Sequence, residues 1–244
     1  MRWRRAPEPM PWPTNMRDGL AALRYTRYAY QRQARDPSGA IVVPRATRSN
    51  LWDAIQHYRF RRKVRGWIAS GVKFGHGVLV MPSVFIDTSY GWLISIGDRT
   101  RLAEEVRILC HDAGPERDLG YGRVGPVTIG RDCILNERVI VLAGVTIGDG
   151  SMIGSGSVVA SDIPPGSRAM GVPARVYGTM EDYREELRRA MQEAPVFGYK
   201  ELHRLSPAER EAAIARMKAA GGRGFHYDPF SLSAYWATPP EDER

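Results

Sequence analysis

The chain has 244 residues, of which 43% are hydrophobic and 9% aromatic, and it carries a formal net charge of +8. This length suits one sizeable domain with additional segments, and no stretch approaches the roughly 18 uninterrupted apolar residues of a membrane-spanning helix. The first residues contain arginines and prolines but no apolar run of the signal-peptide type, so we expect a cytoplasmic protein. Two cysteines, Cys110 and Cys133, are too few for a disulfide framework, and we expect both to be structural thiols.

The positive charge is concentrated at the beginning of the chain. Residues 1–65 contain 15 Lys or Arg against 4 acidic residues, and the densest cluster is Arg59, Arg61, Arg62, Lys63 and Arg65. We favour a solvated helix face for this cluster. The alternatives are peripheral contact with anionic lipid at the inner membrane surface or with a phosphate-bearing substrate, and no nucleic-acid partner is expected.

Helix-compatible spacing over residues 16–35 and 49–69 predicts two N-terminal helices. Their aromatic residues Trp52, Tyr58, Phe60 and Trp67 are expected to form a capping core on the domain that follows. Residues 1–69 therefore read as a basic arm with capping helices.

From residue 72 to residue 159 an aliphatic side chain recurs every sixth position, and Tyr90 is the exception. The positions are Val72, Val78, Val84, Ile96, Leu102, Ile108, Ile129, Leu135, Val141, Ile147, Ile153 and Val159. A period of six fits neither a helix nor simple strand alternation, and it is typical of a solenoid. We predict that each hexad forms one face, that three faces form one coil, and that the glycines following these positions make the corners.

The repeat is interrupted once, between Ile108 and Ile129, where the spacing is much longer than one hexad. A loop over residues 112–126 accounts for the extra length, and it is expected to leave the solenoid and return in register. Such long loops often carry function. Two prolines within residues 162–166 are expected to end the solenoid. Helices are predicted at about 180–193 and from the capping box at Ser206 to Ala220, followed by an aromatic tail that packs on the solenoid or on a neighbouring subunit.

The best candidate for a general base is His111, which stands where the solenoid opens into the loop. A histidine near its free pKa of about 6.5 can accept a proton from a hydroxyl or an amine that attacks an acyl carbon. The acidic residues Asp87, Glu105 and Asp112 are candidates to orient this histidine or to bind a polar acceptor.

Several linked motifs then point to a family. They are the hexads, the run Cys110–His111–Asp112 before the loop, and the segments Pro126–Gly130, Ala143–Gly150, Gly156–Val159, Asp162–Pro165 and Gly171–Arg175. Over about residues 70–178 the chain resembles the hexapeptide-repeat acyltransferases, and it is most similar to the maltose and galactoside O-acetyltransferase branch and its polysaccharide-modifying relatives. The resemblance implies an all-β solenoid wound as a left-handed parallel β-helix, against the usual crossover preference. It also implies a homotrimer with active sites between subunits.

The resemblance assigns roles to individual residues. It implies that His111 is the catalytic histidine, that Asp87 binds the acceptor, and that Ser155, Ala160 and Arg175 contact coenzyme A. Arg175 is expected to pair with the phosphates of the coenzyme, and Gly144 to let it approach the backbone closely. The chain departs from the pattern at Ile134, where many relatives carry an aromatic residue, so the acyl chain accepted stays open.

The predicted reaction is transfer of an acyl group, with acetyl-CoA as donor, to a hydroxyl of a sugar or polysaccharide precursor. No covalent enzyme intermediate and no metal are expected. The alternatives are an N-acetyltransferase acting on an amino sugar or an antibiotic, and a non-catalytic scaffold subunit. A zinc-dependent carbonic anhydrase is disfavoured, since that use of the solenoid needs three histidines and the repeat offers His76 and His111. Residues 179–244 form a C-terminal helical extension with the aromatic tail.

Overall fold

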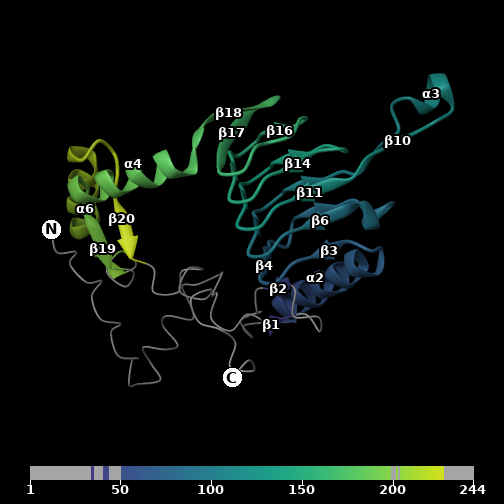
Figure 1. Ribbon diagram of the computed structural model, residues 1–244. Coiled ribbons are helices and arrows are strands. Elements are labelled where there is room, and N and C mark those ends of the chain that lie inside the picture. The colour runs from purple at the N-terminus through teal and green to yellow at the C-terminus, as the bar shows by residue number, and fades with distance from the viewer. Residues whose placement is uncertain (1–33, 36–40, 44–50, 199–201, 203, 228–244) are drawn as a thin grey trace, which may run out of the picture. The chain divides into compact units, whose positions relative to one another are not determined.

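The computed structural model describes residues 34–35, 41–43, 51–198, 202 and 204–227 (Figure 1). The chain separates into two compact units, and the division lies between Glu186 and Leu187, inside helix α4 (Met180–Glu193). This is later than the predicted boundary at residue 179. Among the described residues, no helix has both the length and the hydrophobicity needed to cross a membrane.

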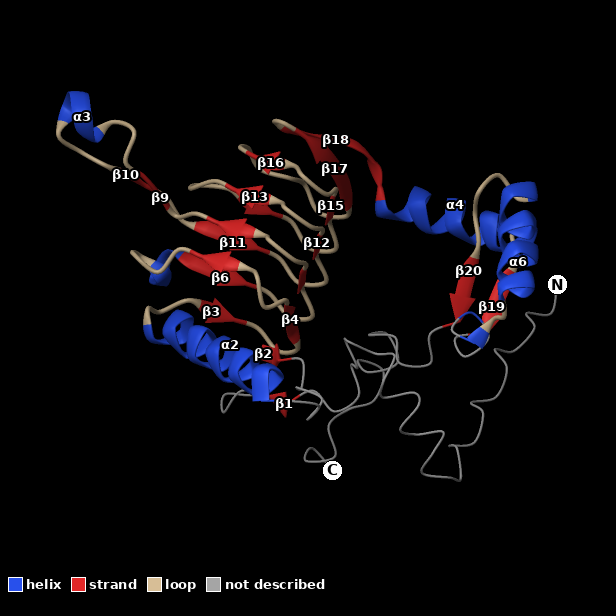
Figure 2. Cartoon of the chain, turned by 180° about the vertical axis from the view of Figure 1, so that it is seen from behind, coloured by secondary structure: helices blue, strands red, loops and turns tan. Residues whose placement is uncertain are grey.

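The first unit contains a solenoid of three parallel sheets (Figure 2). Sheet A contains β4 (Val78–Val80), β7 (Arg101–Leu102), β12 (Ile134–Leu135), β15 (Met152–Ile153) and β17 (Ser167–Gly171). Sheet B contains β3 (Lys73–Phe74), β6 (Ile94–Ile96), β11 (Val127–Ile129) and β14 (Thr146–Ile147). Sheet C contains β5 (Phe85–Ile86), β8 (Arg107–Ile108), β13 (Ile140–Val141) and β16 (Val158–Val159). Each coil passes through sheets B, A and C in that order, which confirms the predicted three-faced solenoid.

Strand register confirms both the coil length and the loop. Ile129 pairs with Ile147 in the next coil, so a regular coil consists of three hexads, whereas the coil from Ile96 to Ile129 contains three hexads and the loop. The loop contains an antiparallel pair, β9 (His111–Asp112) and β10 (Arg123–Val124), with helix α3 (Glu116–Leu119) between its strands. Figure 1 shows α3 projecting away from the stacked strands.

The first coil differs from the prediction. Phe74 pairs with Ile96, and Val80 and Ile86 pair likewise with Leu102 and Ile108, so this coil is longer than three hexads. The additional length falls between β5 and β6, in a segment that we call the 87–93 insertion and that contains the short 3₁₀ helix η1 (Gly91–Leu93). The six-residue count through Val72, Val78 and Val84 was therefore two positions out of register, and Tyr90 broke the pattern because it lies in the insertion.

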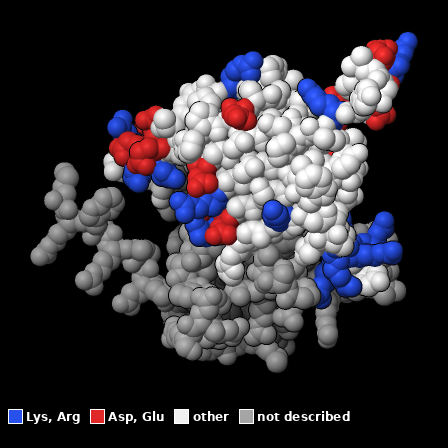
Figure 3. All heavy atoms as spheres, turned by 45° about the vertical axis from the view of Figure 1, so that its right-hand side comes forward, with Lys and Arg blue, Asp and Glu red and all other residues white. Residues whose placement is uncertain are grey.

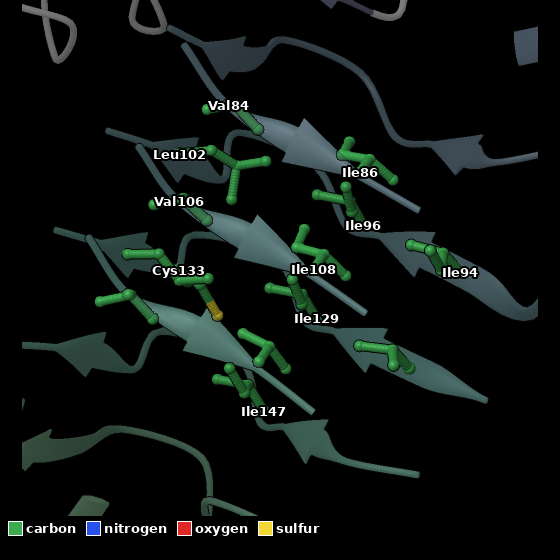
Figure 4. Packing of buried hydrophobic residues seen from close by; sticks show 14 of the residues in the cluster. Val84, Ile86, Ile94, Ile96, Leu102, Val106, Ile108, Ile129, Cys133 and Ile147 are labelled. Carbon is green, nitrogen blue, oxygen red and sulfur yellow. The ribbon is translucent and has the colours of Figure 1, made fainter. Parts of the chain in front are cut away.

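The aliphatic side chains of the repeat form one contiguous core inside the coils (Figure 4). Leu102, Ile108, Leu135, Val141 and Ile153 are completely buried. Fully burying such a side chain contributes about 1.5–3 kcal/mol, so the stacked layers dominate the stability of the solenoid. The residues four positions after each aliphatic repeat position are compact and also buried. They are Thr100, Val106, Cys133, Val139, Val145, Ser151 and Ser157.

The glycines that follow the repeat positions do not make the left-handed corners, and this part of the prediction was wrong. Gly97, Gly130 and Gly148 are absent from the residues with positive φ. They are required because the adjacent coil passes very close, and a Cβ on Gly130 would lie 2.6 Å from the backbone nitrogen of Asp149.

Positive φ occurs instead three residues after the repeat positions. Two coils carry charged residues there, Arg99, Glu105, Asp132 and Arg138, with φ between 54° and 61°. Their side chains pair between coils, with 2.6 Å between Arg99 Nη2 and Asp132 Oδ2 and 2.9 Å between Arg138 Nε and Glu105 Oε2. These pairs are exposed, so each contributes at most about 1 kcal/mol.

Replacing Gly130 by alanine is expected to lower the free energy of unfolding by about 1–3 kcal/mol, because the new methyl group overlaps the backbone of the next coil. Gly178→Ala in β18 (Ala174–Thr179) is the matched control, since nothing lies within 4 Å of a Cβ at that position. Urea denaturation measures both variants. Equal midpoints for the two would contradict the close-approach explanation.

Helix α2 (Leu51–Ala69) covers the first coil, as predicted for the second N-terminal helix. Phe60, Val64 and Trp67 are buried in the shared core, and the Trp67 ring centroid lies 6.4 Å from that of Phe74. Tyr58 is 61% exposed and does not belong to this core, and the side chain of Trp52 lies outside the described residues.

The other predicted N-terminal helix, residues 16–35, lies outside the described residues up to position 33. Its last two residues, Ala34–Arg35, form strand β1 instead, which pairs with β2 (Ile41–Val43). Strand β2 pairs in parallel with β4, so these two short strands extend sheet A before the first coil.

The solenoid does not end at Pro164 and Pro165. Both prolines lie in the turn before β17, where their missing N–H groups interrupt no ladder, and β17 still pairs in parallel with β15. Strand β18 then folds back antiparallel onto β17 and forms the edge of sheet A.

The second unit contains the end of α4, β19 (Val196–Gly198), α6 (Pro207–Ala219) and β20 (Phe225–Tyr227). The predicted capping box is present, because the Ser206 hydroxyl accepts from the backbone N–H of Glu209 and the Glu209 carboxylate accepts from that of Ser206. Phe197 is buried between the elements of this unit. The aromatic tail beyond Tyr227 lies outside the described residues.

Candidate active site

One edge of the solenoid gathers most of the predicted site residues. It is the corner where each coil leaves sheet C, and we call it the C–B edge. Asp87 follows β5, His111 follows β8, Gly144 follows β13 and Ala160 follows β16. Backbone hydrogen bonds connect these turns, from Asp87 N to Ile108 O and from Leu142 N to Val159 O. Successive coils are about 4.8 Å apart, so the four residues form a row.

The centre of the row is a pair formed by His111 and Asp87. Nδ1 of His111 contacts Oδ2 of Asp87, although the two residues are 24 positions apart in the chain. The Asp87 side chain is 4% exposed, whereas the His111 side chain is 40% exposed. The carboxylate therefore lies behind the imidazole, and the other side of the ring faces solvent.

The electrostatic state of Asp87 follows from its surroundings. Burial alone would raise its pKa, but hydrogen bonds from the backbone N–H of Ser89, from His111 and from the Cys110 thiol outweigh burial and lower the pKa to about 2. The carboxylate is consequently ionised and can only accept. Nδ1 of His111 must then carry the proton, which leaves a lone pair on Nε2 in the neutral imidazole.

Cys110 supports this arrangement. Its backbone N–H and its thiol each lie 3.3 Å from Asp87 Oδ2, and the residue is completely buried. Burial, followed by the contact with Asp87, raises the pKa of the thiol to about 11, so the thiol stays protonated and donates. Both cysteines are free and buried, as predicted for structural thiols, but the contact of Cys110 with the site was missed.

Asp87, Cys110 and His111 also have the spacing of a candidate cation site, because their ligand atoms lie within 4.8 Å of one another. The Cys110 thiol and Nδ1 of His111 both contact Asp87 Oδ2, so the ligand atoms are already used within the cluster. The arrangement therefore suits a hydrogen-bonded base better than a metal centre.

The base of the loop closes over the same edge. Arg123 Nη2 lies 3.2 Å from Asp112 Oδ2, and Asp112 Oδ1 accepts from the backbone N–H of Gly114 at 2.8 Å. Gly125 donates to the carbonyl of Cys110, and its backbone passes so close to Gly144 that a Cβ on Gly125 would lie 2.7 Å from Gly144 N. The carboxylate of Asp112 is thus used within the loop, where it fixes β9 against β10.

Glu105 and Ser155 are not brought to His111. Glu105 precedes β8 and His111 follows it, so the two residues stand at opposite ends of this strand. Ser155 lies with Glu105 in a shallow pocket at the corner between sheets A and C, which is also lined by Glu104, Glu137, Arg138 and Gly156. The Ser155 hydroxyl donates to Glu137 Oε2 at 3.1 Å, and Glu105 is paired with Arg138.

The remaining predicted donor-binding residues are open to solvent. Gly144 has φ +83° and nothing within 4 Å of the place of a Cβ, so the corner above it is accessible to a ligand. Ala160 is exposed. Arg175 lies in β18 opposite Met170, and its guanidinium donates to the carbonyl of Ala174 at 3.1 Å.

Tyr90 is a further residue at the site that sequence reasoning did not assign. Its ring meets that of His111 in a T-shaped arrangement with 6.0 Å between centroids, and its carbonyl accepts from the Cys110 thiol. The side chain is 41% exposed. The failure of the six-residue pattern at Tyr90 was the signal that could have directed attention to it.

Comparisons with known proteins agree with this architecture. Residues 126–161 match the family model described as bacterial transferase hexapeptide (six repeats). The chain is 37% identical over 122 residues to “Putative acetyltransferase SAV2555” of Staphylococcus aureus strain Mu50. This match covers 40% of this chain and 60% of that protein. The chain is also 39% identical over 94 residues to the galactoside O-acetyltransferase of Escherichia coli strain K12. This match covers 37% of this chain and 46% of that protein.

Among solved structures, a maltose O-acetyltransferase from Clostridium difficile 630 is 28% identical, with a TM-score of 0.41, and the match covers 54% of this chain and 79% of that one. The chain spans about 60% of the length of the first curated relatives that it matches. The predicted resemblance to the hexapeptide-repeat acyltransferases is confirmed by the family model and by the curated relatives.

Proposed function

We propose that this protein is a CoA-dependent O-acyltransferase that moves an acetyl group from acetyl-CoA to a hydroxyl of a sugar or polysaccharide precursor. The observation that carries the proposal is the buried, ionised Asp87 behind a half-exposed His111 at the C–B edge. A left-handed winding of the β-helix, which the hexapeptide repeat implies, belongs to the same proposal.

The proposed chemistry is direct transfer. The acceptor O–H donates its proton to Nε2 of His111 while its oxygen forms a bond to the thioester carbon. The C–S bond then breaks, and the proton on Nε2 goes to the departing sulfur, which leaves as the free thiol of CoA. Asp87 stabilises the imidazolium that forms between these steps, because its low pKa keeps it ionised. An amine acceptor would use the same base, so an N-acetyltransferase is the nearest rival.

For the donor, the C–B edge offers the exposed residues Ala160 and Gly144 in the coils that follow His111. Close approach to the backbone at Gly144 suits a pantetheine arm, and the Arg175 guanidinium suits the phosphates at its far end. Ser155 stays a proposed contact of coenzyme A, although it lies at the corner between sheets A and C and not at the C–B edge. Glu105 and Asp112 stay proposed acceptor ligands, although both carboxylates already have arginine partners.

A homotrimer with sites between subunits is also proposed. The projecting loop carries three exposed apolar residues, Leu119, Tyr121 and Val124, with exposed fractions of 68%, 77% and 52%. Apolar side chains on a segment that leaves its own core are suited to a neighbouring copy of the chain.

Contact of the basic cluster with anionic lipid is proposed as the alternative to a solvated helix face. In Figure 3, Lys and Arg side chains gather at the lower right, in the region of helix α2 of Figure 1. Arg59, Arg62 and Arg65 are exposed, and none of them makes an ion pair within the described part of the chain, whereas Lys63 donates to the carbonyl of Pro82. Exposed arginines on one helix face suit a negatively charged surface.

Arg175→Ala is expected to raise the KM for acetyl-CoA about tenfold or more and to leave kcat nearly unchanged, because a charge-assisted contact made in both ground and transition states is lost. Steady-state kinetics at saturating acceptor measures this effect. Arg210→Ala, an exposed arginine in α6, is the matched control. An unchanged KM would remove Arg175 from the donor site, and absence of CoA binding to the wild type in calorimetry would favour a scaffold.

A further inference from the structure

The 87–93 insertion packs closely against the two residues that follow α2, Ser70 and Gly71. A Cβ on Gly91 would lie 2.2 Å from Ser70 Oγ, and that hydroxyl is fixed by donating to the carbonyl of Trp67. A Cβ on Gly71 would lie 2.9 Å from the Cβ of Trp92. Both contacts are possible only because glycine has no side chain, so the insertion backbone is held against the helix end.

This attachment presents two aromatic side chains to solvent. Tyr90 is 41% exposed and Trp92 is 64% exposed, although the backbone between them is buried at Gly91. Leu93 N–H and the Cys110 thiol both bond to the carbonyl of Tyr90, which fixes the tyrosine backbone from two directions. The tyrosine ring is therefore exposed on a fixed stretch of backbone, with its centroid 6.0 Å from that of His111.

We infer that Tyr90 is a specificity-determining residue whose ring forms a stacking platform for a pyranose acceptor beside His111. The inference rests on the proposed function and names the acceptor class for that site. A pyranose ring has C–H bonds on its faces and hydroxyls around its rim, so a ring placed on Tyr90 directs a hydroxyl toward the adjacent imidazole.

The polar surroundings suit the same ligand. Asp87 is buried and already accepts hydrogen bonds, so an acceptor would meet the exposed part of His111, and the half-exposed Tyr90 ring lies 6.0 Å from that imidazole. A small open-chain alcohol would gain little from a flat aromatic ring. The insertion thus favours ring-shaped acceptors over simple alcohols.

The test compares Tyr90→Ala, Tyr90→Phe and the control Tyr58→Ala, which removes an exposed tyrosine on α2. The acceptors are methyl pyranosides of glucose and galactose, with glycerol as the open-chain reference. Tyr90→Ala is expected to raise the KM for the pyranosides about fivefold to tenfold. The loss of kcat/KM with glycerol should be smaller than that with the pyranosides, and Tyr90→Phe and Tyr58→Ala should behave as wild type.

An unchanged pyranoside KM in Tyr90→Ala, an equal loss with glycerol, or a change of oligomeric state in light scattering would overturn the inference. Saturation-transfer NMR of the same pyranosides provides a readout that does not need turnover. Binding that is lost in Tyr90→Ala without any wild-type transfer would keep the platform and refute the transferase. Transfer by the wild type together with unaltered pyranoside binding in Tyr90→Ala would refute the platform and keep the transferase.

Discussion

Replacing His111 by alanine is expected to lower the turnover number at least a hundredfold. A hydroxyl is a poor nucleophile, and a positioned base contributes about 10²–10⁴-fold to its attack. The imidazole is the exposed member of the pair with Asp87, so its removal leaves the solenoid core untouched. Release of free thiol from acetyl-CoA with a saturating acceptor measures the loss.

His76→Ala is the matched control for this variant. His76 is an exposed histidine of the first coil, and in the structure its interactions are made through its backbone, with Asp98 and Arg99. Turnover of His76→Ala should equal that of the wild type, and both variants should keep the oligomeric state. Near wild-type turnover of His111→Ala would refute its assignment as the base.

Asp87→Asn should have the second largest effect, a fall in kcat of about 10²–10⁴-fold. An asparagine can donate to Nδ1 through its amide, which would move the imidazole proton to Nε2 and abolish the lone pair that accepts from the acceptor. A comparable carboxylate-to-amide change in the catalytic triad of serine proteases costs about 10⁴-fold in kcat.

The kinetics of Asp87→Asn also separate two roles. An acceptor-binding aspartate, as the family resemblance implies, predicts a raised acceptor KM with kcat maintained, whereas an orienting aspartate predicts a lowered kcat with KM maintained. The structure favours the second role because the carboxylate is 4% exposed and already accepts from Ser89, Cys110 and His111. Asp118→Asn, an exposed carboxylate in helix α3, is the control and should change kcat less than threefold.

The solenoid, the loop and the position of His111 were predictable from the sequence. Inward-pointing side chains of a narrow coil must be aliphatic at every sixth residue, so the pattern at Leu102, Leu135 and Ile153 reports directly on packing. The interruption preserved this pattern on both sides, which located the loop without any structural information.

The register of the first coil was not predictable in the same way. Val72, Val78 and Val84 are buried although they occupy the position four after the repeat position, so hydrophobicity alone does not distinguish the two registers. Strands β1 and β2 have two and three residues, too few to show any periodicity.

Parts of the site also required the structure. The contact between His111 and Asp87 joins two coils, and the longer first coil that brings them together is not visible in the six-residue count. Glu105 is near His111 in sequence but stands at the other end of β8, because a strand carries the chain straight across one face. Sequence proximity was therefore a poor guide to which acidic residue contacts His111.

The central claim is that the Asp87–His111 pair catalyses acyl transfer from acetyl-CoA to a sugar hydroxyl. The most direct measurement is mass spectrometry of sugars and nucleotide sugars after incubation with the purified protein and acetyl-CoA, together with free thiol release. We expect an ester product, one acetyl group heavier than the acceptor, that is formed by the wild type and lost in His111→Ala. An amide product restricted to amino sugars, or an ester formed equally by His111→Ala, would contradict the account.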